Sequence, residues 1–398
     1  MPSTIYILAL ATFAVGTQSY VFTGLLSELA RDLGVSVGVA GQLATAFAIT
    51  SGMAAPFVVN FFSRYERRRL LVSALFLVGL INLGTAFLSS FNLFIAARIL
   101  AALCAILVIP TAGAIAASLV PKNKQGQALG LILSGLTLAL ILGVPLGTVM
   151  GDLFGWRATF VFAGIVALMA MPFVAKLVPI SPGTAEASFS NFKVIKLPVV
   201  KVSLVLSIIS FIAAYPIFAF IGPFIEEVTG LEGAYLGAMQ ATIGVGSIIG
   251  LVLGGKMADG RPFTQNIKIL FGAFIGIQVL FSVWFLFPEL LGTSQMIAPM
   301  ALSIIGSSAI LFATGPVIEK ALVNADPPQA ALTLAMNTSM IYTGQGIGAA
   351  LGGVVIARQG YEAVGGVSAM IAVVAFAIAL MFKAKPKRQV KDHKLATP

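Results

Sequence analysis

Charged residues are scarce in this chain, and cysteine and histidine are almost absent. Only 10% of the 398 residues are Asp, Glu, Lys or Arg, whereas 59% are hydrophobic. Soluble domains carry about 25% charged residues, so one water-soluble core does not accommodate this composition. The mean hydropathy of +1.02 indicates instead that lipid is the solvent for most of the chain. The single cysteine, Cys104, excludes an internal disulfide framework and a cysteine-rich metal site.

Further absences narrow the classes of function. His393 is the only histidine, which excludes a histidine proton relay and the His-Glu-x-x-His motif of zinc proteases. The sequence has no Gly-x-x-x-x-Gly-Lys-Ser/Thr motif, so we expect no nucleotide partner. It also has no recognisable nucleophile–base pair, so we expect neither an enzyme nor a bound cofactor or metal. A soluble basic domain for nucleic acid is lacking as well.

Long apolar runs recur along the whole chain. A transmembrane helix needs about 20 mostly apolar residues, and we find twelve such runs, which predict an all-α membrane protein. The first run has no Lys or Arg before it and no small-residue cleavage site after it, so it predicts a membrane helix, not a signal peptide. The predicted spans are 5–27, 40–62, 70–89, 92–117, 125–150, 159–178, 200–225, 233–257, 268–287, 294–322, 331–357 and 363–382.

The positions of the basic residues indicate the orientation. An even number of spans places both termini on one side of the membrane, and Lys and Arg accumulate in cytoplasmic loops. Almost all of the 24 Lys and Arg residues fall on the side of the two termini, while the opposite side has only Arg31, Arg157 and Arg358. We therefore expect both termini in the cytoplasm.

The spans divide into two groups of six around a polar segment. Residues 179–198 are rich in Pro, Ser and Gly, which favours a cytoplasmic linker between two membrane halves, residues 1–178 and 199–382. An ordinary long cytoplasmic loop is the alternative. Residues 383–398 follow the last span as a basic tail, which we expect in the cytoplasm.

The two groups of spans also repeat a pattern of glycine and aromatic residues at the same spacing. Parallel six-helix repeats are a transporter architecture in which the substrate binds near the membrane midplane, between the repeats. The matched positions are Gly143, Gly147 and Trp156 in the first group and Gly348, Gly352 and Tyr361 in the second.

Small residues are regularly spaced in the fifth span, within LSGLTLALILGVPLGTVMGDLFGWRATF, residues 133–160. Glycines allow helices to approach closely in lipid, and a proline frees a backbone carbonyl and bends the helix. An ordinary small-residue contact between helices would give a similar pattern. The positions concerned are Gly143, Pro145, Gly147 and Gly151, followed by Trp156, Arg157 and Phe160.

This segment resembles the antiporter motif of the major facilitator superfamily, in which the fifth helix is followed by Trp-Arg-x-x-Phe. Residues 21–49 are similar to the first two helices of its twelve-helix drug:proton antiporter branch, which includes bacterial chloramphenicol-efflux and sugar-efflux transporters. The resemblance implies two six-helix pseudo-repeats in a bacterial inner membrane and secondary transport by alternating access. We expect a monomer whose partners are the lipid bilayer, a small-molecule substrate and, as the implied coupling ion, protons.

The loop after the second span carries part of another signature of that family, Gly-x-x-x-Asp-Arg-x-Gly-Arg-Arg. Ser63 replaces the aspartate, and Glu66 is the predicted substitute carboxylate for a charge-pair latch. The accumulation of basic residues in cytoplasmic loops explains the arginines equally well. The predicted latch residues are Arg64, Glu66, Arg67 and Arg68, with Asp259 and Arg261 in a degenerate copy in the second half.

Polar side chains interrupt the apolar runs where we expect a central cavity. In the resembling branch the first helix often carries an acid close to the position of Ser19. Amides, hydroxyls and phenols favour a neutral or weakly charged substrate over a cation. Hydrogen bonds between helices are the alternative role for each residue, and Arg98 has the further alternative of reaching the membrane interface. The predicted cavity residues are Gln18, Ser19, Tyr20, Arg98, Tyr215, Gln240, Asn337, Tyr342 and Gln345.

Carboxylates are not found clearly in the middle of any predicted span, so only the resemblance implies proton coupling. The candidate proton carriers are Glu28, Asp152 and Glu319. The sequence thus predicts a secondary active transporter that exports a drug, sugar or metabolite by proton-coupled alternating access. An uncoupled facilitator, or an importer of a polar metabolite on the same fold, is the alternative.

Overall fold

The computed structural model describes residues 1–121, 124–183, 194–286 and 293–382, and helices are the only regular secondary structure in these ranges. Twelve helices among the described residues are long and apolar enough to cross a membrane, which confirms the predicted fold class. The predicted tail, 383–398, and half of the predicted linker, 179–198, lie outside the described residues. The division into two halves with these boundaries stays a prediction.

The helices follow one another in two groups. The first group consists of α1 (Ser3–Tyr20), α2 (Leu26–Asp32), α3 (Val37–Ala40), α4 (Gln42–Phe62), α5 (Arg67–Thr85), α6 (Phe91–Ala105), α7 (Val108–Ser118), α8 (Gln125–Leu138), α9 (Val144–Phe154) and α10 (Arg157–Leu177). The second group consists of α11 (Pro198–Phe218), α12 (Ile221–Thr229), α13 (Gly233–Gly260), α14 (Phe263–Leu286), α15 (Ile297–Ala325), α16 (Ala330–Gln359) and α17 (Glu362–Met381). Short turns named η1 (Thr23–Leu25), η6 (Thr293–Met296) and η7 (Pro327–Gln329) connect some of them.

Several spans of the first group are interrupted, among them the first and the fifth. The first span is α1, then η1, then α2. The fifth passes from α8 through a π-helical turn, η3 (Ala139–Gly143), into α9. Pro145 lies in the first turn of α9 and has no N–H to donate, so the regular hydrogen-bond pattern changes just before it.

The predicted seventh span, 200–225, is wrong at its end. Helix α11 ends at Phe218, and the residues after Phe220 form the separate helix α12. Pro216 and Pro223 cannot donate backbone hydrogen bonds, which weakens a continuous helix across this segment. Because all of these residues are apolar or small, hydropathy alone did not reveal the break.

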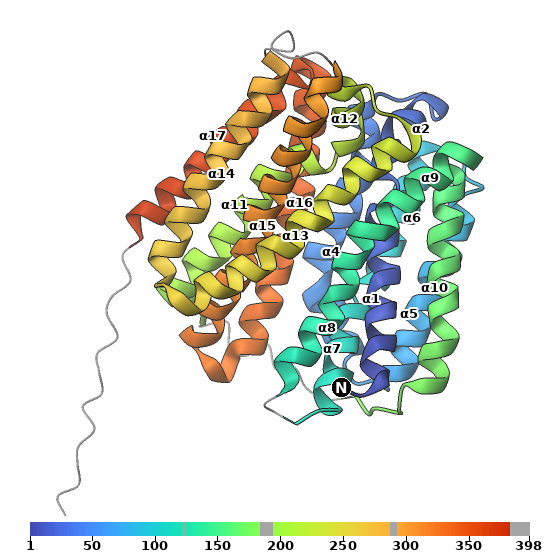
Figure 1. Cartoon of the computed structure of the whole chain (residues 1–398). Helices are drawn as coiled ribbons and strands as arrows, with labels where there is room; N and C mark the ends of the chain where they lie inside the picture. The colour runs from blue at the N-terminus through green and yellow to red at the C-terminus, as the bar shows by residue number, and fades with distance from the viewer. Residues whose placement is uncertain (122–123, 184–193, 287–292, 383–398) are drawn as a thin grey trace, which may run out of the picture.

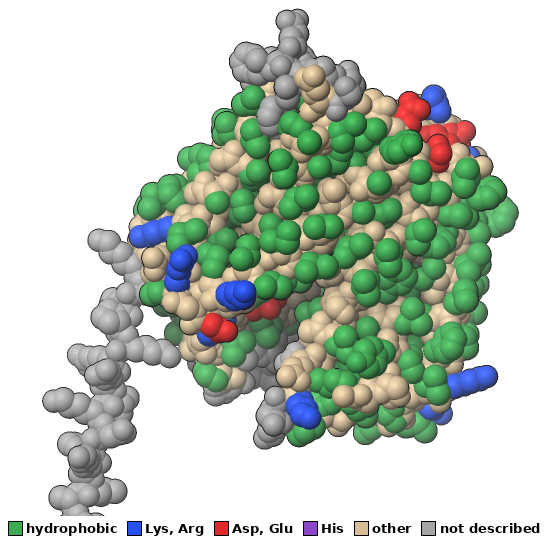
Figure 2. Space-filling model, in the orientation of Figure 1, with side chains coloured by type: hydrophobic (Ala, Val, Ile, Leu, Met, Phe, Trp, Pro, Cys, Tyr) green, Lys and Arg blue, Asp and Glu red, His purple; other side chains and the backbone are tan. Residues whose placement is uncertain are grey.

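The two groups of helices meet at one end and separate at the other. Helices α2 and α12 lie at the same end, where α12 packs against η1 and α2, and the N-terminus lies at the opposite end (Figure 1). We call these the α2/α12 end and the N-terminal end. Figure 2 shows the surface hollowed between the two groups at the N-terminal end. The same view shows hydrophobic side chains over the flank and charged ones near the two ends, as a lipid-facing belt requires.

A buried apolar cluster accounts for closure at the α2/α12 end. It combines side chains of both groups, including Phe22 and Leu26 from the first and Phe220 and Phe224 from the second. Fully burying a side chain of this size stabilises a structure by about 1.5–3 kcal/mol relative to leaving it in water. Separating the groups at this end would therefore expose apolar surface to solvent.

Candidate functional site

Arg98 is buried against the end of the first helix. Its guanidinium donates to the carbonyl oxygens of Gln18 at 3.0 Å and Ser19 at 3.2 Å, and the side chain is 2% exposed. The last carbonyls of a helix lack partners within it and carry a partial negative charge, so a cation is favourable there. The rings of Phe22 and Phe47 each lie 4.6 Å from the guanidinium carbon. Arg98 thus contacts the segment at the end of α1 that the sequence predicts to line the cavity.

A chain of hydrogen bonds continues from this point. The Asn82 side chain of α5 donates to Gln18 Oε1 at 3.4 Å, and Gln18 Nε2 donates to the Ser19 hydroxyl at 3.3 Å. Ser19 in turn donates to the carbonyl of Val15 at 2.7 Å. Sequence reasoning missed Asn82, although an amide inside the run 70–89 was a usable signal. These amides hold one another in place and fix the end of α1.

Three tyrosines from three helices gather beside that end. The Tyr20 hydroxyl at the end of α1 lies beside Tyr215 of α11 and Gln345 of α16. Tyr342 of α16 lies near Tyr20 and Tyr215. The structure therefore brings together predicted residues from both groups of helices, and we call these four residues the tyrosine cluster. Phenol and amide groups supply hydrogen-bond donors, acceptors and aromatic faces to a ligand.

Two other predicted cavity residues are engaged in contacts between helices. Asn337 accepts a hydrogen bond from the Ser207 hydroxyl at 2.5 Å, which joins α16 to α11. Gln240 is fully buried and accepts from the Thr148 hydroxyl at 2.8 Å, which joins α13 to α9. Both amides thus form hydrogen bonds between helices, which the sequence analysis gave as the alternative to lining a cavity. No described group pairs with Gln240 Nε2.

The glycines of the fifth span pack directly against the first helix. A Cβ added at Gly143 would lie 2.5 Å from the Thr17 hydroxyl, and one at Gly147 or Gly151 would overlap Val21 or Leu25. Side chains at these positions would push the fifth span away from the first span, α1 and η1. The close approach needs glycine because lipid supplies no hydrophobic drive to force helices together.

The opposite face of the fifth span contacts the second group. A Cβ at Gly244 of α13 would overlap Ile141, and one at Gly237 would lie 3.2 Å from the carbonyl oxygen of Pro145. The predicted motif thus lies between α1 and α13 and contributes to the contact between the two groups.

Helix α16 repeats this arrangement in the second group. A Cβ at Gly348 would lie 2.7 Å from Tyr215 Cβ, and one at Gly352 would lie 2.8 Å from Pro216 Cα, both on α11. On its other face, a Cβ at Gly353 would lie 2.5 Å from the Gly38 carbonyl oxygen in the first group. The matched spacing seen in the sequence therefore corresponds to matched packing in the structure.

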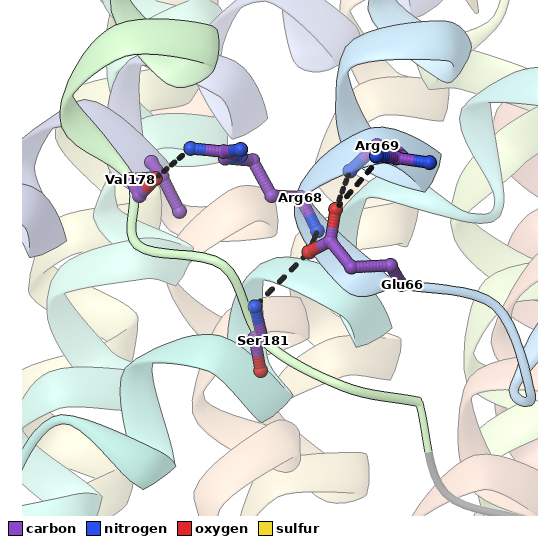
Figure 3. Close-up of polar contacts among 5 residues, drawn as sticks. All are labelled: Glu66, Arg68, Arg69, Val178 and Ser181. Atoms are coloured by element: carbon purple, nitrogen blue, oxygen red, sulfur yellow. Dashed lines mark hydrogen bonds and ion pairs between the residues drawn. The ribbon is translucent and has the colours of Figure 1, made fainter.

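Glu66 caps the start of α5 and reaches the chain beyond α10 (Figure 3). Its carboxylate accepts hydrogen bonds from the backbone N–H groups of Arg68 at 2.8 Å, Arg69 at 2.9 Å and Ser181 at 3.0 Å. Burial works to raise the pKa of Glu66, but these three donors outweigh it and hold the pKa below its ordinary value. The Arg68 side chain donates to the carbonyl of Val178 at 3.3 Å.

The role of Glu66 in a charge-pair latch stays a prediction. Its main partners are backbone N–H groups, and Arg69, 3.9 Å away, is the side chain that pairs with it. Arg67 instead donates its backbone N–H to Ser181 at 2.8 Å. Arg64 stacks on the ring of Phe61 at 4.8 Å. This loop holds the ends of α5 and α10 together, so it acts within the first group.

The second copy of the loop differs again. Asp259 pairs with Lys320 of α15 at 2.5 Å, and not with Arg261. The Arg261 backbone N–H donates to the carbonyl of Met257 at 3.0 Å, at the end of α13. Both charged side chains of the Asp259 pair are well exposed, so the pair contributes about 0–1 kcal/mol.

The predicted proton carriers lie on three separate elements. Glu28 of α2 lines a pocket of about 450 Å³ together with Asp32 and Arg157, which form an ion pair at 2.5 Å. Asp152 of α9 is so close to the start of α13 that a Cβ at Gly233 would lie 2.5 Å from its carboxylate. Glu319 is on α15. Among the described residues, no group of His, Cys, Asp and Glu is arranged to hold a metal ion.

Comparison with known proteins decides the family. The family model described as Major Facilitator Superfamily matches residues 8–319. The chain belongs to this superfamily. It is 31% identical over 395 residues to an uncharacterized MFS-type transporter, YbcL, of Bacillus subtilis (strain 168), with 98% of each chain covered. It is 34% identical to a chloramphenicol resistance protein of Streptomyces lividans over 267 residues, covering 66% of this chain and 68% of the relative.

Solved structures of the superfamily share the fold. A D-xylose-proton symporter superposes with a TM-score of 0.79 at 17% identity, with 97% of this chain and 98% of the symporter covered. A bacterial homologue of the human lysosomal transporter Spinster gives a TM-score of 0.73 at 15% identity, with 95% of each chain covered. The protein is therefore a multi-pass membrane transporter of the major facilitator superfamily, and not an enzyme.

Proposed function

We propose that this transporter exports a small neutral or weakly charged molecule by proton-coupled alternating access. The observation that carries the proposal is the tyrosine cluster, Tyr20, Tyr215, Tyr342 and Gln345, which draws on helices of both groups. A substrate bound there would contact both halves, so their relative movement would change its access. The cluster consists of phenols and an amide, which orient a neutral substrate by hydrogen bonds and aromatic contact.

The substrate class is supported by a sequence relative as well as by chemistry. One relative, 34% identical over 267 residues, is a chloramphenicol resistance protein. We infer that neutral antibiotics are the first substrates to test, with sugars and other polar metabolites next. A cation would need a carboxylate partner in the apolar cavity, and Ser19 stands where the resembling branch often has one.

The orientation is part of the proposal. Lys and Arg favour the cytoplasmic side, and they are concentrated on the side of the termini. We infer that the N-terminal end faces the cytoplasm of a bacterial cell and that the α2/α12 end faces outward. The hollow at the N-terminal end then belongs to an inward-open state of a monomer in the inner membrane.

Everted membrane vesicles that contain the overexpressed protein provide the test. We would energise them, follow internal acid with a quenched dye, and add neutral antibiotics, sugars, nucleosides or cationic dyes in turn. We expect a neutral compound to restore fluorescence, and Tyr20→Phe or Tyr342→Phe to weaken this response because each removes one hydroxyl. Tyr235→Phe is the matched control, since that side chain is 75% exposed.

An uncoupled facilitator or an importer gives a different result in the same vesicles. Fluorescence would not recover with any compound, yet labelled compound would still exchange across the membrane in counterflow. That outcome would overturn proton-coupled export while leaving a substrate site at the tyrosine cluster.

A further inference from the structure

A hydrogen bond joins the two groups of helices at the closed α2/α12 end. The Ser27 hydroxyl of α2 lies 2.8 Å from Glu226 Oε2 of α12, although the residues are 199 positions apart in the sequence. The backbones meet closely beside this bond, since a Cβ at Gly222 would lie 2.7 Å from the Thr23 carbonyl oxygen. The Glu226 carboxyl group thus lies in the contact that must break when this end opens.

We propose that Glu226 is a proton-binding latch that favours closure of the α2/α12 end when protonated and its opening when ionised. The latch regulates the transport cycle put forward above, and its direction across the membrane rests on the orientation proposed there. Glu226 is not among the candidate carriers that the sequence predicted.

The surroundings of Glu226 favour its neutral form in the closed state. Within the described part of the chain, the titratable groups that face it are Glu28 on α2, Glu232 ahead of α13 and Tyr361 ahead of α17, together with its neighbour Glu227. Turns η1 and η6, which also pack against α12, contain no titratable side chain, and α11 and α15 bring none within interaction range.

Cations do not compensate for these acids. Among the described residues no Lys or Arg forms an ion pair with Glu226. Arg31 of α2 interacts with Asp32, which also pairs with Arg157. An ionised carboxylate in this partly buried contact would therefore meet negative neighbours without a cationic partner.

The sign of the pH dependence follows from these contacts. Burial raises the pKa of Glu226, Glu232 and Glu28 raise it further, and the Ser27 hydrogen bond lowers it only in part. Opening returns the carboxyl to water, where the ordinary pKa is about 4.3. The closed state thus binds the proton more tightly than the open state does. The stabilisation of the closed state by protonation is complete at pH values below the open-state pKa. This stabilisation is lost as the pH rises through the closed-state pKa.

The hydroxyl of Ser27 suits either form of the latch. It donates to the carboxylate when Glu226 is ionised, and its oxygen accepts from the carboxyl group when Glu226 is protonated.

In the proposed orientation an acidic exterior would close the outer end. The conformational equilibrium then changes by at most about tenfold per pH unit, because one proton is involved.

A distance measurement tests the latch without substrate. We would replace the one native cysteine by Cys104→Ala and introduce Val39→Cys and Tyr235→Cys, which are exposed positions on α3 and α13. Nitroxide labels at these sites, in lipid nanodiscs frozen between pH 5 and pH 9, report separation of the two groups by pulsed electron resonance. In the parent protein, the fraction of molecules with a short distance between the two labels, the short-distance fraction, should fall as the pH rises.

Three variants locate the effect. Glu226→Gln should keep the short distance across the pH range, whereas Glu227→Gln, the exposed neighbour, should retain the parental pH dependence. Ser27→Ala should lower the short-distance fraction at acidic pH. A parent protein without pH dependence, or a Glu226→Gln variant that keeps it, would overturn the latch. Since no transport is measured, failure of proton-coupled export in vesicles would leave this result intact.

Discussion

Replacing Gly353 by alanine should open the α2/α12 end. The new Cβ would lie 2.5 Å from the Gly38 carbonyl oxygen and 2.9 Å from Gln42 Nε2. Close carbon–oxygen contacts in proteins lie at about 3.3–3.6 Å, so α16 and α3 must move apart by roughly 0.8 Å. The Gly38 carbonyl belongs to the backbone, so a change of side-chain rotamer cannot relieve the overlap.

The cost of this overlap gives the size of the expected effect. Overpacking of a tight contact costs about 1–3 kcal/mol. The cost applies to the closed state alone, so the ratio of open to closed molecules should rise by about 5- to 150-fold. Gly255→Ala is the matched control, because it makes the same change in a helix at a position with open space around it.

Cysteine labelling measures the opening. With Cys104→Ala as background, Thr23→Cys places a thiol at a position that is 6% exposed next to α12. A membrane-impermeant maleimide should label it faster in the Gly353→Ala variant and at the parental rate in the Gly255→Ala variant. Equal rates in two folded variants would refute the reasoning, because the closed contact would then tolerate a methyl group.

Two further predictions concern stability in detergent. Arg98→Lys should lower the unfolding temperature, because one ammonium cannot reproduce both guanidinium contacts with α1 and a lost charge-assisted bond costs about 1.5–3 kcal/mol. Arg157 is in an exposed ion pair, so Arg157→Lys should lower the unfolding temperature less. A larger effect of Arg157→Lys would contradict the role assigned to Arg98. Glu66→Gln should lower the unfolding temperature at neutral pH, since the pKa of Glu66 is depressed in the folded state. That difference should persist down to the ordinary carboxyl pKa of about 4.3 and vanish as the pH falls through the folded-state pKa. A difference that stays constant at all pH values would mean that the charge is not involved.

Features that depend on local sequence were predictable. Apolar runs gave the transmembrane helices, because the thickness of the bilayer sets their length. The spacing of Gly143, Gly147 and Gly151 placed them on one helix face, and that face packs against the first span. Arg98 was recognisable because a charge inside an apolar run needs a partner. Its partners, the last carbonyls of α1, depend on the three-dimensional arrangement.

Features that depend on a distant partner were not predictable. Glu66 was predicted as a carboxylate for a charge-pair latch, and no sequence pattern indicated that it also binds the backbone of its own helix and of Ser181, more than a hundred residues away. Ser27 and Glu226 are unremarkable in the sequence, since each lies at the end of an apolar run. Only the meeting of α2 with α12 makes them partners.

The repeated packing of α9 and α16 shows what the two groups share and where they differ. The fifth span contacts α1 in its own group and α13 in the other, while α16 contacts α11 in its own group and α3 and α4 in the other. The α9–α13 contact contains the side-chain hydrogen bond between Thr148 and Gln240. The α16–α3 contact brings the backbones of Gly38 and Gly353 together.

These differences predict unequal tolerance to mutation. A polar side-chain bond can be remade after a small shift, because side chains rotate, whereas two backbones in contact have no such freedom. Replacing a glycine by alanine in the α16–α3 contact should therefore separate the two groups of helices more readily than the same replacement in the α9–α13 contact.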